Sequence, residues 1–366
     1  MEKSSTGQLL LIGIPGSELD SATAAILRQV QPGGYILFGR NIKSADQLRK
    51  LTDDLRDVSA VEPIITIDQE GGRVSRIREI GNEPPSAQQL REAGDTRLIE
   101  WHGHLTGKLL RLFGFNLDLC PVLDICYDET ADNSLKGRCY GTTVEEVCEK
   151  ADIFNRCLQE EGILSCGKHF PGYSNAGIDP HHELPAINRT LEELETEELK
   201  VFRYFNEKVD SLMIGHAHYP CFDKESLPAS LSPSVIREYL VGKMKFPGLI
   251  MTDDLDMGAI LNSFGLEETM QRCIDAGNHL AMICHRLTVV QEAAGYLNAM
   301  PAKTLDAALE AVAEFKKKLA PSENYSEMKF WKLDKEVWDL RVATLGEERA
   351  RERTPEDGKR SPVETY

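Results

Sequence analysis

The sequence predicts an α/β protein folded as a single (β/α)8 barrel, and three observations lead to this prediction. The chain has 366 residues, a length that suits one large barrel. Eight short apolar runs recur along it, and several lack polar–apolar alternation, as expected for parallel strands covered on both faces. Helix-like segments separate the runs. An open doubly wound sheet is the alternative, but no GxGxxG motif follows the first run.

The strands and helices are predicted from separate local signals. The eight predicted strands are residues 8–14, 34–38, 64–68, 116–120, 163–169, 210–216, 248–254 and 279–284. Helix starts are predicted where Ser or Thr precedes Gln or Glu by three residues, which is the capping-box pattern. These pairs are Ser44 with Gln47, Thr143 with Glu146, and Thr190 with Glu193. Ser232 before Pro233 predicts a further helix, with an N-cap and a proline at the first helical position.

The last part of the chain differs from the rest. We predict a barrel over residues 1–320 and a C-terminal helical extension over 321–366. Residues 322–343 contain spaced apolar side chains and should form a helix packed on the barrel. Those side chains are Trp331, Leu333, Val337, Trp338 and Leu340. From Glu347 onward the chain is charged and contains almost no large apolar residue, so this tail is expected to be disordered.

Composition and charge exclude several classes of function. Hydrophobic residues make up 41% of the chain and charged residues 28%, which is typical of a globular protein. The net charge of −17 argues against nucleic acid or an anionic membrane as a partner. The start of the chain lacks a signal-peptide pattern, and no apolar stretch approaches the roughly 20 residues that span a bilayer. Nine cysteines without a CxxC pair indicate buried free thiols and a reducing compartment, and we expect a cytoplasmic protein.

The catalytic residues of such a barrel should follow the carboxyl ends of its strands. The polar residues at these positions are Asp68, Asp124, Lys168, His169, His216, His218, Asp253 and Asp254. Each one alone is as readily explained by a structural ion pair, but several converge on one end of the barrel. An aspartate at the end of a buried strand, such as Asp253, is held rigidly and suits a carboxylate nucleophile.

Two stretches after strands carry further candidates. Residues 168–185 lack helical periodicity and contain Asp179, His181, His182 and Glu183, and an imidazole oriented by a carboxylate is suited to proton transfer. In residues 67–77, Gly71 and Gly72 permit a tight turn. Arg73 and Arg76 then follow Asp68, where they would form an ion-pair cluster or hold a polar ligand.

Taken together, the motifs resemble glycoside hydrolase family 3, and within it the single-domain bacterial β-N-acetylglucosaminidases (β-hexosaminidases). The resemblance covers about residues 8–320. Its motifs are ILFGRNI (36–42), IDQEGGRVSR (67–76), CPVLDI (120–125), KGRCYG (136–141), KHFPG (168–172) with DPH (179–181), and MTDDLDMGA (251–259). This chain departs from the pattern at Tyr173-Ser174, where His-Gly is usual, and at Pro180, where a small hydroxyl residue is usual.

The resemblance implies a barrel fold and a retaining mechanism without a metal or organic cofactor. Asp253 matches the family nucleophile, His181 the acid/base and Asp179 its partner. The positions that hold the sugar match Asp68, Arg76, Arg138, Lys168 and His169. We therefore expect release of terminal, non-reducing β-linked N-acetylglucosamine through a glycosyl-aspartate, in the recycling of cell-wall (peptidoglycan) fragments. The expected partner is a small carbohydrate, and the protein is expected to be a monomer or a homodimer.

Other functions remain open at this point. Within the family, the chain could use phosphate in place of water, or act as a β-glucosidase. From another class, a metal-dependent barrel hydrolase would use His216 and His218 with His181, His182 and Asp253 as ligands. A non-catalytic sugar-binding barrel is the last alternative, and a covalent intermediate would exclude it.

Overall fold

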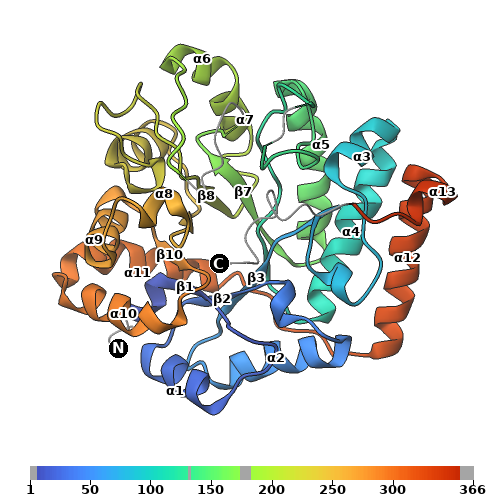
Figure 1. Ribbon diagram of the computed structural model, residues 1–366, viewed down its shortest axis with the longest axis horizontal. Helices are drawn as coiled ribbons and strands as arrows, with labels where there is room; N and C mark the ends of the chain where they lie inside the picture. Colours follow the sequence, from blue (N-terminus) through green and yellow to red (C-terminus); the bar gives the residue numbers. More distant parts are fainter. Residues whose placement is uncertain (1–5, 131–132, 174–182, 355–366) are drawn as a thin grey trace.

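The computed structural model describes residues 6–130, 133–173 and 183–354 (Figure 1). Eight parallel strands form a closed barrel in the order β1-β10-β9-β8-β7-β6-β3-β2. The strands are β1 (Leu10–Gly13), β2 (Gly34–Leu37), β3 (Ile64–Ile67), β6 (Leu117–Asp118), β7 (Leu164–Phe170), β8 (Ser211–Ile214), β9 (Leu249–Asp254) and β10 (Leu280–Ile283). Each strand overlaps one predicted run, so the predicted barrel is confirmed.

Helices surround the strands on the outside of the barrel (Figure 1). They are α1 (Ser21–Val30), α2 (Ala45–Asp57), α3 (Ala87–Ala93), α4 (Thr96–Leu112), α5 (Val144–Glu160), α6 (Leu191–Thr196), α7 (Glu198–Tyr204), α8 (Gly258–Leu261), α9 (Leu266–Ala276), α10 (Val290–Ala299) and α11 (Ala302–Lys316). Single turns of 3-10 helix are η1 (Thr6–Leu9), η2 (Gly39–Asn41), η3 (Ile77–Glu79), η4 (Ala229–Leu231) and η6 (Leu287–Val289).

The predicted helix starts are all present, with differences in detail. Ser44 and Thr190 form complete capping boxes at α2 and α6. Thr143 caps α5 through the backbone N–H of Glu146, but the Glu146 side chain accepts from Thr142 instead of returning to the cap. The hydroxyl of Ser232 accepts from the backbone N–H of Val235, and the following η5 (Ser234–Lys243) is wound as a π-helix.

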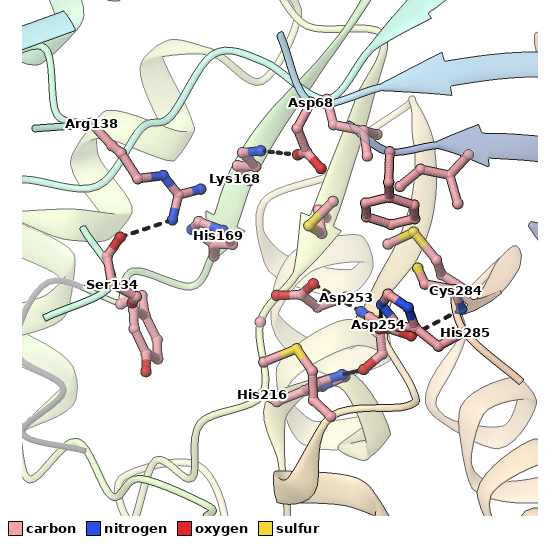
Figure 2. A pocket seen from close by; sticks show the side chains of 18 of the residues that line it. Asp68, Ser134, Arg138, Lys168, His169, His216, Asp253, Asp254, Cys284 and His285 are labelled. Carbon is pink, nitrogen blue, oxygen red and sulfur yellow. Dashed lines mark hydrogen bonds and ion pairs between the residues drawn. The ribbon is translucent and has the colours of Figure 1, made fainter. Parts of the chain in front are cut away.

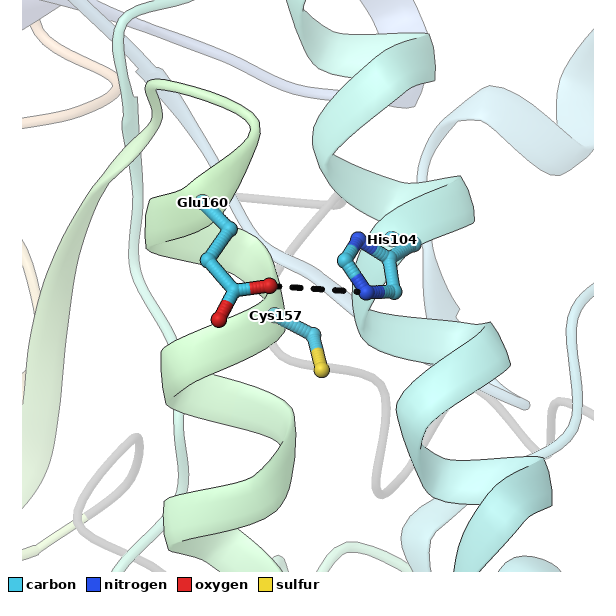
Figure 3. Close-up of side chains that lie close together, drawn as sticks. All are labelled: His104, Cys157 and Glu160. Atoms are coloured by element: carbon cyan, nitrogen blue, oxygen red, sulfur yellow. Dashed lines mark ion pairs between the residues drawn. The ribbon is translucent and has the colours of Figure 1, made fainter.

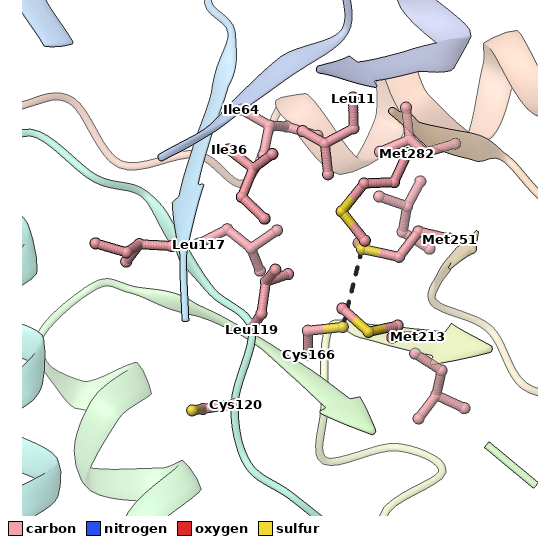
Figure 4. Close-up of a cluster of buried hydrophobic side chains, with 14 of the residues drawn as sticks. Leu11, Ile36, Ile64, Leu117, Leu119, Cys120, Cys166, Met213, Met251 and Met282 are labelled. Atoms are coloured by element: carbon pink, nitrogen blue, oxygen red, sulfur yellow. Dashed lines mark hydrogen bonds between the residues drawn. The ribbon is translucent and has the colours of Figure 1, made fainter. Parts of the chain in front are cut away.

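Sulfur-containing and aliphatic side chains fill the interior of the barrel (Figure 4). Met213, Met251 and Met282 come from neighbouring strands, and the Met251 sulfur lies 4.0 Å from the Cys166 sulfur. Methionine is unbranched and polarizable, so it fills irregular gaps in such a core. Met213 and Met282 also line a pocket in the barrel.

The free thiols agree with the sequence prediction only in part. All nine cysteines are free, as predicted. Cys126, Cys148 and Cys221 are half-buried rather than buried; Cys126 and Cys221 lie in loops, and Cys148 lies on α5. Within the described residues, no helix combines the length and the apolar character that crossing a membrane requires.

A small hairpin after β3 was not predicted. β4 (Gln69–Gly71) and β5 (Val74–Ser75) pair antiparallel around the predicted Gly71–Gly72 turn. Gly71 has φ +106°, and a Cβ there would lie 2.2 Å from the Pro85 carbonyl oxygen, so only glycine fits. Strands of two or three residues carry too little periodicity to be recognised in the sequence.

The C-terminal part forms α12 (Glu327–Leu345), which packs against α2, α3 and α4. Phe330, Val337 and Leu340 are buried there, whereas Trp331 is exposed. The expectation of disorder from Glu347 onward is wrong for the first residues of the tail. Glu347–Ala350 forms α13, and buried Arg341 donates to the Ala350 carbonyl at 2.8 Å. Residues 355–366 lie outside the described residues, and the division at residue 320 stays a prediction.

Candidate active site

A pocket opens at the carboxyl ends of the barrel strands, where the sequence places the polar residues (Figure 2). It encloses about 720 Å³, open mouth included. Its polar lining residues are Asp68, Arg76, Ser134, Arg138, Lys168, His169, His216, Asp253, Asp254 and His285. The structure therefore brings all five predicted sugar-holding residues and Asp253 into one cavity.

One side of the pocket is a buried network of alternating charges. Lys168 Nζ lies 2.6 Å from Asp68 Oδ1 and 2.7 Å from Glu70 Oε1. Arg138 donates to both oxygens of Glu70, from Nη2 at 2.7 Å and from Nε at 2.8 Å. Burial raises the pKa of Glu70, but the charges of Arg138 and Lys168 outweigh this effect and hold that pKa below its usual range. Glu70 thus stays ionised and anchors both cations in the pocket wall.

Lys168 itself is fully buried except for its contact with the pocket. Burial lowers the pKa of its ammonium group, but Asp68 and Glu70 raise that pKa above its usual value. Lys168 is therefore a permanent cation, and with Asp68 it offers both donors and acceptors to a polyhydroxylated ligand. Glu70 was not among the predicted site residues, although it stands in the same motif.

The two arginines after the Gly71–Gly72 turn behave differently. Arg76 Nη2 lies 3.8 Å from Asp68 Oδ2, and its guanidinium lies over the Phe38 ring at 5.8 Å. Arg73 instead extends to the backbone carbonyls of Ser134 and Lys136. The hypothesis that both arginines stand beside Asp68 is therefore wrong for Arg73, because it holds the neighbouring loop.

His169 is oriented by a buried carboxylate. Its Nδ1 lies 2.7 Å from Asp124 Oδ2, and the other oxygen of Asp124 accepts from the Tyr173 backbone N–H at 2.6 Å. Because an ionised carboxylate only accepts hydrogen bonds, Nδ1 carries the hydrogen, and Nε2 is left as an acceptor. Asp124 is thus a positioning residue beneath the pocket rather than part of its lining.

The two aspartates at the end of β9 have different environments. Asp254 Oδ1 accepts from the backbone N–H groups of Asp256 and Cys284 at 2.9 and 3.1 Å, and Oδ2 lies 3.3 Å from His285 Nε2. Asp253 is the more exposed, and one of its oxygens accepts from the Asp254 N–H at 2.8 Å. Asp254 is held by the fold, whereas Asp253 presents its carboxylate to the pocket (Figure 2).

His285 and Arg40 extend this side of the site and were not predicted. Arg40 Nη1 lies 3.1 Å from His285 Nδ1, and Nη2 donates to the Cys284 carbonyl at 2.6 Å. Arg40 comes two residues after the predicted strand 34–38, and His285 comes directly after the predicted strand 279–284. The rule that selects polar residues after strands would have found them if it had been applied to the residues that follow the second and the eighth run.

The two histidines after β8 form hydrogen bonds to other residues of the protein. His216 is buried in the pocket wall, with Nδ1 2.7 Å from the Ser230 hydroxyl and Nε2 2.9 Å from the Asp254 carbonyl. His218 Nδ1 contacts the Leu227 backbone. Because both nitrogens of His216 form hydrogen bonds within the protein, the HxH sequence does not present a metal-binding pair to the pocket, which disfavours the metal-dependent alternative.

The predicted acid/base pair belongs to the segment that follows β7. Asp179, His181 and His182 lie in residues 174–182, outside the described residues. The chain reaches this segment from Tyr173, which lines the pocket, and continues at Glu183.

Beneath the charged network, Asp118 on β6 is fully buried. One of its oxygens accepts from the Gln69 N–H at 3.0 Å, and the other has no hydrogen-bond partner among the described residues. Burial raises the pKa of Asp118 to about 8, although the Gln69 N–H and Lys168 oppose this shift. Its carboxyl group therefore stays protonated near neutral pH.

We expect Asp118→Asn to stabilise the protein increasingly as pH rises. The pKa of Asp118 is about 8 in the folded state and 3.8 in the unfolded chain. The folded state therefore binds more protons between pH 3.8 and about pH 8, and the free energy of unfolding of the wild type falls as pH rises through this range. Asparagine keeps the acceptor oxygen but cannot ionise. The stability of Asp118→Asn relative to the wild type should grow by up to about 1.4 kcal/mol per pH unit and level off above about pH 8. Urea unfolding of both proteins across this range measures it, and a pH-independent difference would contradict the protonation argument.

Comparison with known proteins gives consistent results. Residues 2–315 match the family model described as the glycosyl hydrolase family 3 N terminal domain. A β-hexosaminidase of Tolumonas auensis is 34% identical over 280 residues, which cover 75% of this chain and 82% of that protein. A family 3 β-N-acetylglucosaminidase from Paenibacillus sp. FPU-7 has a TM-score of 0.84 at 29% identity, covering 94% of this chain and 69% of that one. NagZ from Neisseria gonorrhoeae, solved with N-trifluoroacetyl-D-glucosamine, has a TM-score of 0.78 at 27% identity, covering 91% and 97%.

Proposed function

The chain belongs to glycoside hydrolase family 3, and we propose that it releases terminal, non-reducing β-linked N-acetylglucosamine by two displacements at the anomeric carbon. The observation that supports this most directly is the pocket itself. A rigid carboxylate, Asp253, and a charged network for hydroxyl groups, centred on Lys168, share one cavity at the catalytic end of a barrel. The similarity to named β-N-acetylglucosaminidases supports the choice of sugar.

In the proposed binding step, the terminal sugar lies against the charged network. Asp68 accepts hydrogen bonds from ring hydroxyls, and Lys168, Arg138 and Arg76 donate to its oxygens. His169, with Nδ1 committed to Asp124, offers Nε2 as an acceptor. Since these side chains are buried and already paired, the sugar is oriented without further ordering of the protein, which favours in-line attack.

In the first displacement, a carboxylate oxygen of Asp253 bonds to the anomeric carbon while the bond to the leaving oxygen breaks. His181 donates its proton to that oxygen, a role that rests on the likeness of residues 179–181 to the family motif. The product is a glycosyl-aspartate of inverted configuration. The ring carries positive charge in the transition state, so the carboxylates of Asp253 and Asp68 stabilise it.

In the second displacement, water attacks the anomeric carbon and breaks the bond to Asp253. His181, now neutral, takes the proton from this water, and Asp179 orients the imidazole. The second inversion restores the β configuration, so the sugar is released with overall retention. No metal takes part in either step.

We propose further that the natural substrate is a cell-wall fragment ending in N-acetylglucosamine and that the protein acts in the cytoplasm. Its nine free thiols fit a reducing compartment. A soluble wall-derived disaccharide should then be cleaved faster than a chitin-type disaccharide.

The proposal is tested by comparing aryl β-glycosides of N-acetylglucosamine, glucose and xylose. We expect kcat/KM for the N-acetylglucosaminide to exceed that for the glucoside by at least about 100-fold, because a site that binds a substituent through hydrogen bonds rejects the sugar lacking it. NMR should show the β anomer first, and EDTA should leave the rate unchanged. A preference for glucoside, release of the α anomer, or a rate that depends on phosphate would each contradict the proposed hydrolysis.

A further inference from the structure

Three potential metal ligands meet on the outside of the barrel, between α4 and α5 (Figure 3). They are His104 on α4 and Cys157 and Glu160 on α5, and one ligand atom from each lies within 4.8 Å of the others. His104 Nε2 is 3.7 Å from Glu160 Oε2. Within the described residues, this is the group of His, Cys, Asp and Glu side chains close enough to hold a metal ion.

Two glycines explain why these side chains come so close. A Cβ on Gly103 would lie 2.7 Å from the Cys157 Cβ, and a Cβ on Gly107 would lie 2.6 Å from the Glu161 Cβ. The two helices therefore approach more closely than larger residues would allow, and His104, next to Gly103, faces α5. Cys157 and Glu160 are three residues apart and share one face of that helix.

The ring of His104 is held in place by a hydrogen bond from its other nitrogen, Nδ1, which is not the proposed ligand atom. Its Nδ1 lies 2.7 Å from Glu161 Oε1. The carboxylate accepts this hydrogen bond, so Nδ1 carries the hydrogen, and Nε2, which lies 3.7 Å from Glu160 Oε2, is left as the coordinating nitrogen. A carboxylate that holds the outer nitrogen of a histidine is the arrangement that fixes ring and tautomer in zinc sites.

We propose that His104, Cys157 and Glu160 bind a Zn²⁺ ion, with water as the fourth ligand. One imidazole, one thiolate and one carboxylate suit zinc better than magnesium or calcium, which prefer oxygen ligands. Tetrahedral zinc places its ligand atoms about 3.3–3.8 Å apart. His104 Nε2 and Glu160 Oε2 are already at this spacing. The Cys157 ligand atom lies within 4.8 Å of the other two, so rotations of the Cys157 and Glu160 side chains would close the remaining distance.

Zinc binding would couple the two helices at a distance from the sugar. Coordination replaces the Cys157 thiol proton, so one proton is released for each ion bound. Glu160 is the last residue of α5, which leads into the start of β7. This end of the strands is opposite the pocket, so the site is separate from catalysis and should stabilise the fold.

Cobalt(II) and zinc(II) titrations of the chelator-treated, reduced wild-type protein test the site directly. Cobalt should give tetrahedral visible bands and a sulfur-to-cobalt charge-transfer band, which zinc should abolish at one equivalent. Zinc should raise Tm and leave N-acetylglucosaminide hydrolysis unchanged. Cobalt spectra without a charge-transfer band, or an absence of zinc binding, would overturn the proposal even if every variant failed to fold.

Variants identify the ligands. Cys157→Ser and His104→Gln should each weaken zinc binding by at least about 100-fold and remove the rise in Tm, while Glu161→Gln should weaken it by about 10- to 100-fold. Cys148→Ala is the matched control, since Cys148 is a half-buried thiol on the same helix, and its zinc affinity should equal that of wild type. Zinc that still binds Cys157→Ser tightly, or that inhibits hydrolysis, would reside elsewhere and refute the assignment.

Discussion

Asp253→Ala should lower kcat for the N-acetylglucosaminide by at least about 10⁴-fold, because the first displacement then lacks its nucleophile. The neighbouring carboxylate cannot replace it. Asp254 is held by two backbone N–H groups and by His285, and it would have to leave these partners to reach the sugar. The variant should remain folded, since Asp253 is the more exposed of the two aspartates.

A mechanism-based label distinguishes the two aspartates. A 5-fluoro derivative of N-acetylglucosaminyl fluoride should accumulate as a covalent adduct, and peptide mass spectrometry should locate it on Asp253. Azide should partly restore turnover of Asp253→Ala and give the α-glycosyl azide, because the anion attacks from the side of the missing carboxylate.

Asp254→Asn is the matched control. Asparagine keeps the acceptor oxygen for the two backbone N–H groups, so we expect a loss of at most about 100-fold from misplacement of the neighbouring nucleophile. A label on Asp254 or Glu70, or an Asp254→Asn variant as inactive as Asp253→Ala, would show that the nucleophile is assigned to the wrong residue.

His181→Ala should lower the rate by about 10²- to 10⁴-fold for substrates with poor leaving groups, which need protonation to depart. An activated aryl leaving group needs little help, so its glycosyl-enzyme should still form, and hydrolysis of that intermediate should become rate-limiting. A burst of released phenol followed by slow turnover would report this change. Asp179→Asn should show a milder loss and a displaced pH profile, since the imidazole loses its partner.

Azide also tests the acid/base assignment, and here the expected product has the opposite anomeric configuration to the product from Asp253→Ala. Added to His181→Ala, it should restore turnover and give the β-glycosyl azide, because a small anion attacks the glycosyl-enzyme without a general base. Two other histidines are rivals: His182, the next residue, and His169, which the structure pairs with Asp124 at 2.7 Å. Rescue of His182→Ala or His169→Ala, and not of His181→Ala, would transfer the acid/base role to that residue.

Much of the fold was predictable because its signals are local. A parallel strand buried on both faces is mostly apolar, and each of the eight runs overlaps a barrel strand. Parallel strands also end at one side of a barrel, so the residues after them meet there. This is why Asp68, Lys168, His169 and Asp253 could be assigned to one pocket without coordinates.

The pairing of these residues was not predictable, since it depends on side chains that come from different strands. Glu70 joins Lys168 to Arg138, Arg73 turns away to a neighbouring loop, and His216 forms hydrogen bonds inside the wall. Each depends on strand register and loop path, which are set by packing of the whole barrel. The sequence alone therefore indicated which residues surround the pocket but not their partners.

The same distinction holds on the outer surface. Nothing in the sequence singles out His104 or Cys157, and no spacing rule connects residues so far apart. Only the tertiary structure brings α4 and α5 into contact at Gly103 and Gly107 and thereby places an imidazole beside a thiol and a carboxylate. Periodicity is a local property of the chain, so it determined the elements and their order. Contacts between elements depend on how closely they pack, and the tertiary structure decided them.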